Sequence, residues 1–122
     1  MTAYIVFAHG SSVESANDAV RAVSKEAGRR GAWKLYETAF LGGGRPNLEE
    51  AVAKLASDGA TDIVVIPYFL TSGLHLGRDL PALIGEIRRT HPETAIRATE
   101  PLDGHPGLID AVLDRAGKVE SH

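Results

Sequence analysis

The chain has 122 residues, which suits one domain, and we expect a single domain over residues 1–122. Apolar residues make up 43% and charged residues 24%, as in ordinary globular proteins, and the net charge of −3 argues against nucleic-acid binding. The absence of cysteine excludes thiolate metal sites, disulfides and cysteine nucleophiles, and it fits a reducing cytoplasm, where we expect the protein to act. We expect no signal peptide, and no membrane segment because no apolar run approaches about 20 residues.

The first part of the chain is predicted to be a strand, a helix and a second strand. Tyr4–Ala8 is a short apolar strand, and Lys34–Phe40 is a second strand with more alternation. Between them, helical spacing predicts a buried face made of Ala16, Ala19, Val20, Val23 and Ala27. Ser15 with Asp18 resembles a capping box at the helix start, and Gly31 is placed to end the helix.

The middle of the chain continues this order with a helix and a strand. The apolar positions of the helix are Leu48, Ala51, Val52, Leu55 and Ala56. Asn47 with Glu50 can cap its start, and Gly59 can end it. The strand Asp62–Leu70 contains the β-branched run Ile63–Ile66, which is typical of a strand covered on both faces.

The last part of the chain adds two helices and one strand. The third helix is predicted from Leu80, Leu83, Ile84 and Ile87, with Asp79 as its N-cap and Pro81 in its first turn. Ala95–Thr99 is a weaker fourth strand, and the last helix carries Leu108, Ile109, Val112 and Leu113. With right-handed crossovers, this alternation predicts an α/β fold: a small four-stranded parallel sheet, flavodoxin-like, with helices on both faces.

Two histidines follow predicted strands. His9 comes directly after the first strand, and His75 lies in the loop predicted between Pro67 and Pro81. The carboxyl ends of parallel strands meet at one edge of a sheet, where ligands bind. We therefore expect two imidazoles at one site, for a divalent metal or for proton transfer. For His9, a turn histidine bonded to a neighbouring carbonyl is the competing interpretation, and Asp79 can cap a helix, orient an imidazole or do both.

Small, hydroxyl-bearing and cationic residues accompany the two histidines in the predicted edge loops. Small residues let a ligand approach the backbone, hydroxyls can donate to ligand carboxylates, and guanidinium groups match carboxylate geometry. For Arg45 and Arg78, a solvent-exposed position is an equally good interpretation. The candidate substrate-binding residues are Gly10, Ser11, Ser12, Arg45, Thr71, Ser72 and Gly73.

Several familiar enzyme motifs are absent. The run Gly42–Gly44 lacks the Lys-Ser/Thr of a phosphate loop, so we expect no nucleotide and interpret the run as a flexible flap beside a bulky ligand. Ala8 stands where a histidine phosphatase would carry arginine, and no Gly-x-Ser-x-Gly elbow is present. His105 is interpreted as a turn residue.

Four segments in order resemble the small sirohydrochlorin chelatase family, the short cobaltochelatase-type proteins of cobalamin and sirohaem biosynthesis. They are Ala8–Ser11, Ala39–Leu41 before Pro46-x-Leu48, Pro67–Pro81 and Pro101–Pro106. The specific segment is the third, which reads Pro-x-Phe-Leu-x-x-Gly-x-His-x-x-x-Asp-Leu-Pro. The resemblance runs from residue 4 to about residue 115.

The resemblance implies that a divalent metal is inserted without ATP into a sirohydrochlorin-type tetrapyrrole, with Co²⁺ favoured and Ni²⁺ or Fe²⁺ as alternatives. It also implies that His9 and His75 bind the metal or accept pyrrole protons, and that two copies form a homodimer with a cleft between them. Neutral imidazole suits both tasks, because its ordinary pKa of about 6.5 lies near working pH. Nitrogen and oxygen ligands hold these metals with moderate affinity, which suits delivery.

Two positions depart from the family pattern. Gly42 stands where many members carry glutamate, and Ser12 stands where many carry arginine. The main alternative function is therefore a non-enzymatic module of the same fold that binds the metal or the tetrapyrrole, as a carrier or accessory subunit. A flavodoxin-like nucleotide or signalling domain is a third interpretation, but the chain lacks a phosphate loop and a phospho-acceptor aspartate after the first strand.

Overall fold

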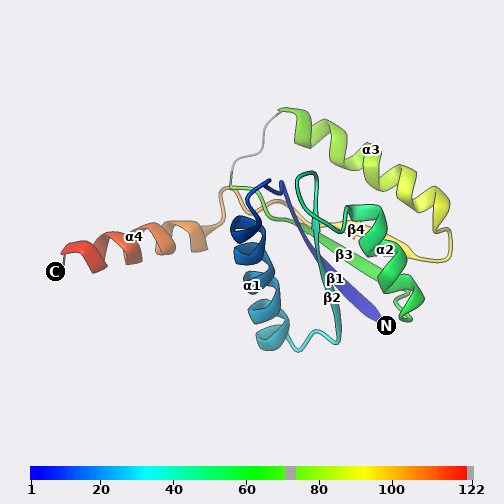
Figure 1. The fold of residues 1–122 in the computed structure, drawn as a ribbon, viewed down its shortest axis with the longest axis horizontal. Coiled ribbons are helices and arrows are strands. Elements are labelled where there is room, and N and C mark those ends of the chain that lie inside the picture. The colour runs from blue at the N-terminus through cyan, green and yellow to red at the C-terminus, as the bar shows by residue number, and fades with distance from the viewer. Residues whose placement is uncertain (71–73, 121–122) are drawn as a thin grey trace.

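Strands and helices alternate along the whole chain (Figure 1). The structure is a computed structural model that describes residues 1–70 and 74–120, and for residues 74–78 it describes the backbone without the side chains. The elements are β1 (Thr2–Ala8), α1 (Glu14–Gly31), β2 (Leu35–Phe40), α2 (Leu48–Ser57), β3 (Asp62–Pro67), α3 (Leu74–Thr90), β4 (Ala95–Ala98) and α4 (Pro106–Glu120). None of the helices described here combines the length and apolar character needed to cross a membrane.

The four strands form one parallel sheet in the order β2-β1-β3-β4. In its centre, Val6 of β1 lies between Thr38 of β2 and Ile66 of β3. The predicted four-stranded parallel α/β fold is therefore confirmed, with β3 ending at Pro67 instead of Leu70. Because the strands are parallel, the loops that follow them gather at one edge of the sheet.

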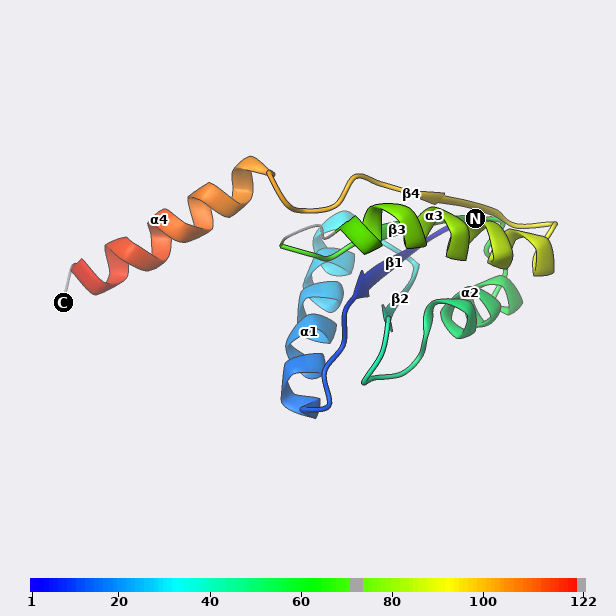
Figure 2. The ribbon, with the colours of Figure 1, turned by 90° about the horizontal axis from the view of Figure 1, so that it is seen from above.

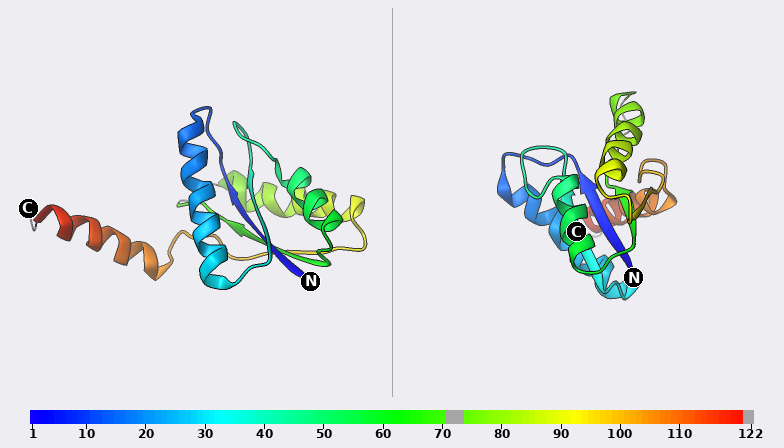
Figure 3. Two further views of the ribbon diagram at one scale, coloured as in Figure 1. Left: turned by 60° about the horizontal axis from the view of Figure 1, so that its bottom comes forward. Right: turned by 90° about the vertical axis from the view of Figure 1, so that its right-hand side faces the viewer.

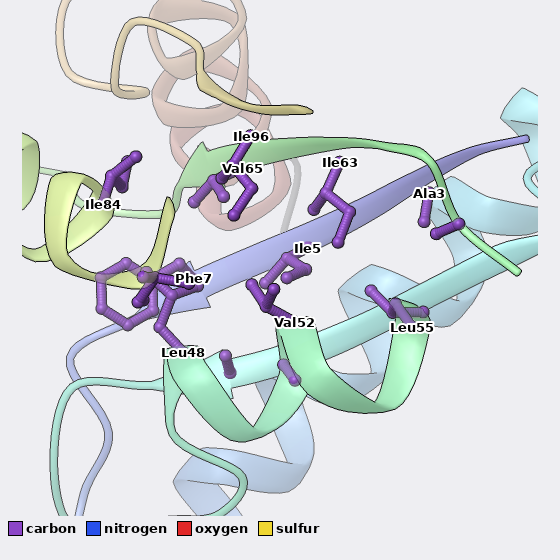
Figure 4. Close-up of a cluster of buried hydrophobic side chains, with 14 of the residues drawn as sticks. Ala3, Ile5, Phe7, Leu48, Val52, Leu55, Ile63, Val65, Ile84 and Ile96 are labelled. Atoms are coloured by element: carbon purple, nitrogen blue, oxygen red, sulfur yellow. The ribbon is translucent and has the colours of Figure 1, made fainter. Parts of the chain in front are cut away.

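The hydrophobic core lies between the sheet and the helices α2 and α3. Alternate residues of β1 and β3 point to this side because successive side chains of a strand face opposite ways. Figure 4 shows Ile5, Val65 and their neighbours meeting side chains of α2 and α3. The predicted capping box of α2 is confirmed, since Asn47 Oδ1 accepts from the Glu50 amide at 2.8 Å and Glu50 Oε1 accepts from the Asn47 amide at 2.9 Å.

Helix α1 lies on the opposite side of the sheet from α2, but its buried face differs from the prediction (Figure 4). Asn17, Ser24 and Gly28 are buried, whereas Val23 is 41% exposed. The small side chains let the helix approach the sheet closely, so that a Cβ on Gly28 would lie 3.0 Å from the Tyr36 ring. Of the predicted apolar positions, Ala16, Ala19 and Val23 are exposed, and Val20 and Ala27 are half-buried. The predicted Ser15 capping box is also wrong, because the N-cap is Val13, whose side chain makes no capping bond.

Helix α3 begins earlier than predicted. It starts at Leu74, so that Pro81 lies inside the helix and Asp79 is not its N-cap. The prediction relied on the preference of proline for the first helical turn, which this helix does not follow. As a result, His75 lies in the first turn of α3 and not in a loop.

Helix α4 does not cover the sheet. It follows β4 and extends away from the rest of the chain, as Figures 1 and 2 and the left view of Figure 3 show. None of its residues is buried. Helices therefore lie on both sides of the sheet as predicted, but only through α1 on one side and α2 with α3 on the other.

Candidate functional site at the carboxyl edge of the sheet

His9 lies at the carboxyl edge of the sheet, where its side chain contacts the aromatic ring of Phe69. It directly follows β1, and its side chain is exposed. The imidazole meets the buried Phe69 ring edge-on, with centroids 4.7 Å apart and planes at 82°. Phe69 in turn packs against Phe7 at 6.0 Å. Between this imidazole and the carbonyls of the described residues, the structure shows no hydrogen bond.

The loop after β1 is joined to the loop after β2 by backbone hydrogen bonds. The Leu41 amide donates to the Ala8 carbonyl and the Gly42 amide donates to the His9 carbonyl, both at 2.9 Å. Gly10 has φ +85°, and a Cβ there would lie 1.7 Å from the Gly42 oxygen. The Gly42–Gly44 run is therefore hydrogen-bonded to the histidine loop, and our interpretation of it as a flexible flap stays a prediction.

Asn17 of α1 ties the same two loops together from beneath. Its Oδ1 accepts from the Ser11 amide at 2.9 Å, and its Nδ2 donates to the Ser11 carbonyl at 2.9 Å and to the Gly43 carbonyl at 3.3 Å. Only 1% of Asn17 is exposed. We did not predict this residue as part of the site, because a single asparagine inside a helix carries no motif. Its position seven residues before Ser24, on the same helix face, is the signal that could have identified it.

The charged side chains near the edge are mostly paired with each other. Arg45 is exposed and forms an ion pair with Glu50. The Asn47 amide and the Arg45 guanidinium hold the pKa of the Glu50 carboxyl below its ordinary value. Arg21 pairs with Glu14 and lowers the pKa of that carboxyl as well. Arg45 therefore points to the start of α2, and a ligand carboxylate would have to compete with Glu50 for it.

A shallow hollow of about 200 Å³ lies beside this edge, between the start of α2 and helix α3. Its apolar lining includes Phe7, Phe40, Leu41 and Leu83. Pockets that enclose small molecules usually measure about 300–1,000 Å³. The hollow is therefore too small to enclose a tetrapyrrole, but it can form one wall of a larger site.

The structure places part of the predicted site and leaves the rest undescribed. His9, Gly10, Ser11 and Ser12 lie together on the loop after β1, and the Ser11 hydroxyl accepts from the Val13 amide at 3.0 Å. Arg45 lies on the loop after β2, which is joined to this loop. Thr71, Ser72 and Gly73 lie outside the described residues, as does the His75 side chain. The meeting of the two imidazoles therefore remains a prediction.

Two further observations concern metal binding and the remaining histidines. Within the described part of the chain, no group of three or more His, Cys, Asp or Glu side chains is placed to hold a metal ion. His105 is a turn residue, as expected, because its Nδ1 accepts from the Gly107 amide at 2.8 Å at the start of α4. His9 and His105 therefore both follow the carboxyl end of a strand, and the Nδ1 atom of His105 is engaged by the Gly107 amide.

Comparison with known proteins agrees with this fold. The CbiX family model matches residues 3–119. The sirohydrochlorin cobaltochelatase of Methanopyrus kandleri is 27% identical, with 94% of each chain covered. The crystal structure of a putative cobalamin biosynthesis CbiX protein from Marinobacter aquaeolei has a TM-score of 0.85 and 28% identity, covering 99% of this chain and 98% of that one. SirB from Bacillus subtilis subspecies spizizenii in complex with cobalt has a TM-score of 0.88 at 24% identity, a likeness in fold that covers 97% of this chain and 50% of SirB. This chain belongs to the CbiX family.

Proposed function

We propose that this protein inserts a divalent metal, Co²⁺ in the first place and Ni²⁺ or Fe²⁺ as alternatives, into a sirohydrochlorin-type tetrapyrrole. The main support for the proposal is the match to the CbiX family over residues 3–119. Curated proteins that are similar to this chain are named sirohydrochlorin cobaltochelatases. An exposed imidazole at the ligand-binding edge of a parallel sheet supports it further.

Metallation of a tetrapyrrole requires proton acceptors and a metal ligand, and we propose His9 for one of these roles. Two pyrrole N–H groups each lose a proton while the metal loses water and gains ring nitrogens. A neutral imidazole can accept one of these protons or hold the metal before transfer. The contact with the Phe69 ring restricts rotation of the imidazole. We propose His75 as the second such imidazole.

The residues around His9 fit a flat, anionic substrate. We propose that Gly10, Ser11 and Ser12 contact the macrocycle and its carboxylates, together with Arg45, Thr71, Ser72 and Gly73. Ser11 and Ser12 carry small side chains, which leaves room for a planar ring to approach this loop. No step of the proposed reaction requires a nucleotide.

We also propose that the active form is a homodimer. The hollow beside the edge is too small to enclose the substrate. This chain aligns with 50% of the longer SirB chain. A second copy can therefore supply the opposite wall that a longer chain supplies from its other half.

The test follows tetrapyrrole absorbance after addition of Co²⁺, Ni²⁺ or Fe²⁺ to purified protein. His9→Ala should lower the metallation rate by about 100-fold or more, because a positioned proton acceptor contributes at least that much. His91→Ala is the matched control, since His91 follows the end of α3 at the opposite edge of the sheet. Equal rates for both variants would contradict the site assignment.

The second candidate, a binding module without catalysis, is favoured by one observation. Gly42 occupies the place of the family glutamate, and space around it is open, with no atom within 4 Å of a Cβ built there. The protein thus lacks a carboxylate at a position that has room for one. Tight binding of metal or tetrapyrrole by the purified protein without any metallation would identify this second function.

A further inference from the structure

Arg21, on helix α1, has a guanidinium group that is fixed by charged and aromatic partners. Its Nη1 donates to Glu14 Oε1 at 2.5 Å and to Asp18 Oδ1 at 2.8 Å, both on the same helix. Its Cζ lies 5.1 Å from the centre of the buried Phe40 ring, a distance at which a cation and an aromatic face attract each other. The position of this guanidinium is therefore set from three directions.

The second terminal nitrogen of Arg21 reaches the loop after β2. Its Nη2 donates to the backbone carbonyl of Arg45 at 3.2 Å. The next carbonyl of this loop, that of Pro46, accepts from the Phe40 amide at 2.9 Å. The Arg45 side chain meanwhile pairs with Glu50 in the first turn of α2. Arg45 is thus held through its backbone from α1 and through its guanidinium from α2.

The two arginines differ in what they can offer to an anionic ligand. Glu14 and then Asp18 raise the pKa of the Arg21 guanidinium, so this group stays charged. Two carboxylates beside one guanidinium leave no excess positive charge for a ligand. The Arg21 side chain is 34% exposed, whereas that of Arg45 is 82% exposed. Arg45 is therefore the arginine that can meet a ligand, and Arg21 lies behind it.

We propose that Arg21 is a positioning residue, which holds the Arg45 backbone where the Arg45 guanidinium meets a carboxylate of the tetrapyrrole. This inference rests on the proposed function, in which Arg45 contacts the substrate. A guanidinium binds a carboxylate best through two parallel hydrogen bonds, which demand a defined approach. A fixed backbone limits the positions that the side chain samples, so less freedom is lost when the substrate binds.

The first experiment titrates sirohydrochlorin against the folded full chain without metal. Arg21→Met keeps an apolar stem beside Phe40 and removes all hydrogen-bond donors of the side chain. We expect it to weaken binding about tenfold. Arg29→Met is the matched control, because Arg29 pairs with Glu26 three residues before it, as Arg21 pairs with Asp18, but lies in the last turn of α1. It should change binding less than about twofold, and equal effects of the two variants would overturn the proposal.

A double-mutant cycle tests whether Arg21 acts through Arg45. Arg45→Ala alone should weaken sirohydrochlorin binding about tenfold or more, because it removes the guanidinium that meets the carboxylate. Adding Arg21→Met to Arg45→Ala should then weaken binding less than about twofold further, because the group that Arg21 positions is gone. Additive losses would show that Arg21 acts independently and would overturn the proposal. Wild-type affinity in Arg45→Ala, or a wild type that binds no sirohydrochlorin, would overturn it as well.

A conservative variant separates positioning from stability. Arg21→Lys keeps the positive charge beside Phe40 but carries it on one nitrogen in place of a fork of two. It should recover most of the stability lost in Arg21→Met, measured by urea denaturation, and still bind sirohydrochlorin about tenfold more weakly than the wild type. Wild-type affinity in Arg21→Lys would show that the bond to the Arg45 carbonyl has no role in binding.

Metallation kinetics on the same variants distinguish this inference from the proposed function. Arg21→Met should raise KM for sirohydrochlorin and leave kcat within about twofold, because the contact is made equally before and during the reaction. A large loss of kcat at unchanged KM would overturn the positioning role. A wild type that binds sirohydrochlorin through Arg45 and never metallates it would refute the chelatase function and leave the role of Arg21 intact.

Discussion

Replacing Asn17 by alanine tests whether substrate binding depends on the hydrogen bonds by which Asn17 holds the loop after β1 to the loop after β2. Asn17 makes two short hydrogen bonds, both to Ser11 at 2.9 Å, and weaker contacts with Gly43 at 3.3 Å and Glu14 at 3.2 Å. A net contribution of about 0.5–1.5 kcal/mol per bond gives a loss of about 1–3 kcal/mol in the free energy of unfolding. The same change releases Ser11 and Gly43 from each other.

Ser24→Ala is the matched control for this experiment. Ser24 is fully buried on the same face of α1, where its hydroxyl accepts from Thr38 Oγ1 at 2.7 Å and donates to the Val20 carbonyl at 3.3 Å. Its loss leaves the Thr38 hydroxyl without this partner, so a similar destabilisation of about 1–2 kcal/mol is expected. Ser24 contacts β2 and does not touch either edge loop. The two variants therefore match in stability and differ at the site.

The assay combines urea denaturation with a titration of the tetrapyrrole against folded protein. We expect Asn17→Ala to weaken tetrapyrrole binding at least tenfold, which corresponds to about 1.4 kcal/mol, and Ser24→Ala to change it less than about twofold. If both variants weaken binding equally, Asn17 acts only through stability. If neither variant weakens tetrapyrrole binding, then binding does not depend on how Asn17 holds the two loops together, and the reasoning is refuted.

Three further predictions concern the glycines of the edge and the start of α2. Gly10→Ala should abolish metallation and lower the melting temperature, because its Cβ would lie 1.7 Å from the Gly42 oxygen. Gly42→Ala should be tolerated, because no atom lies within 4 Å of a Cβ built there. Equal melting temperatures for the two variants would contradict this prediction. Gly42→Glu should raise the metallation rate, because open space lets a carboxylate enter the site as a proton acceptor; an unchanged rate at equal substrate affinity would count against that role. The Glu50 carboxyl, whose pKa is lowered by the Asn47 amide and by Arg45, stabilises the fold above its ordinary value of 4.5 and loses this contribution as pH falls below it. Urea denaturation between about pH 7 and pH 3 should therefore show a smaller acid-dependent loss of stability in Glu50→Gln than in the wild type.

The elements predictable from sequence were those whose signals are local. The β-branched run Ile63–Ile66 indicates a strand, and the Asn47–Glu50 pair indicates a helix start, because each depends on a few adjacent residues. The predicted cover on both faces of this strand is only partly confirmed, since Val64 and Ile66 are half-buried. The buried face of α1 was not predictable from apolar spacing, since close approach to Tyr36 selects Gly28 and the other small residues. The early start of α3 was hidden by Pro81, which is tolerated inside this helix.

The site was predictable only where residue type and strand position coincide. His9 was found because it follows a strand directly, which fixes its place at the carboxyl edge. Asn17 was not found, because its role arises from contacts across 26 residues with Gly43 and from burial beneath two loops. The outward direction of α4 had no signal either, since its apolar spacing is the same whether the helix covers its own sheet or extends away from it.

The backbone bonds between the His9 and Gly42 loops have a thermodynamic consequence for ligand binding. A loop that is mobile before it binds must lose conformational entropy, at about 1–2 kcal/mol for each residue that becomes ordered. Here the peptide groups of Ala8 and His9 are already anchored to Leu41 and Gly42 in the free protein. Under the proposed function, binding of a macrocycle at this rim costs less loop-ordering entropy, because these peptide groups are already anchored.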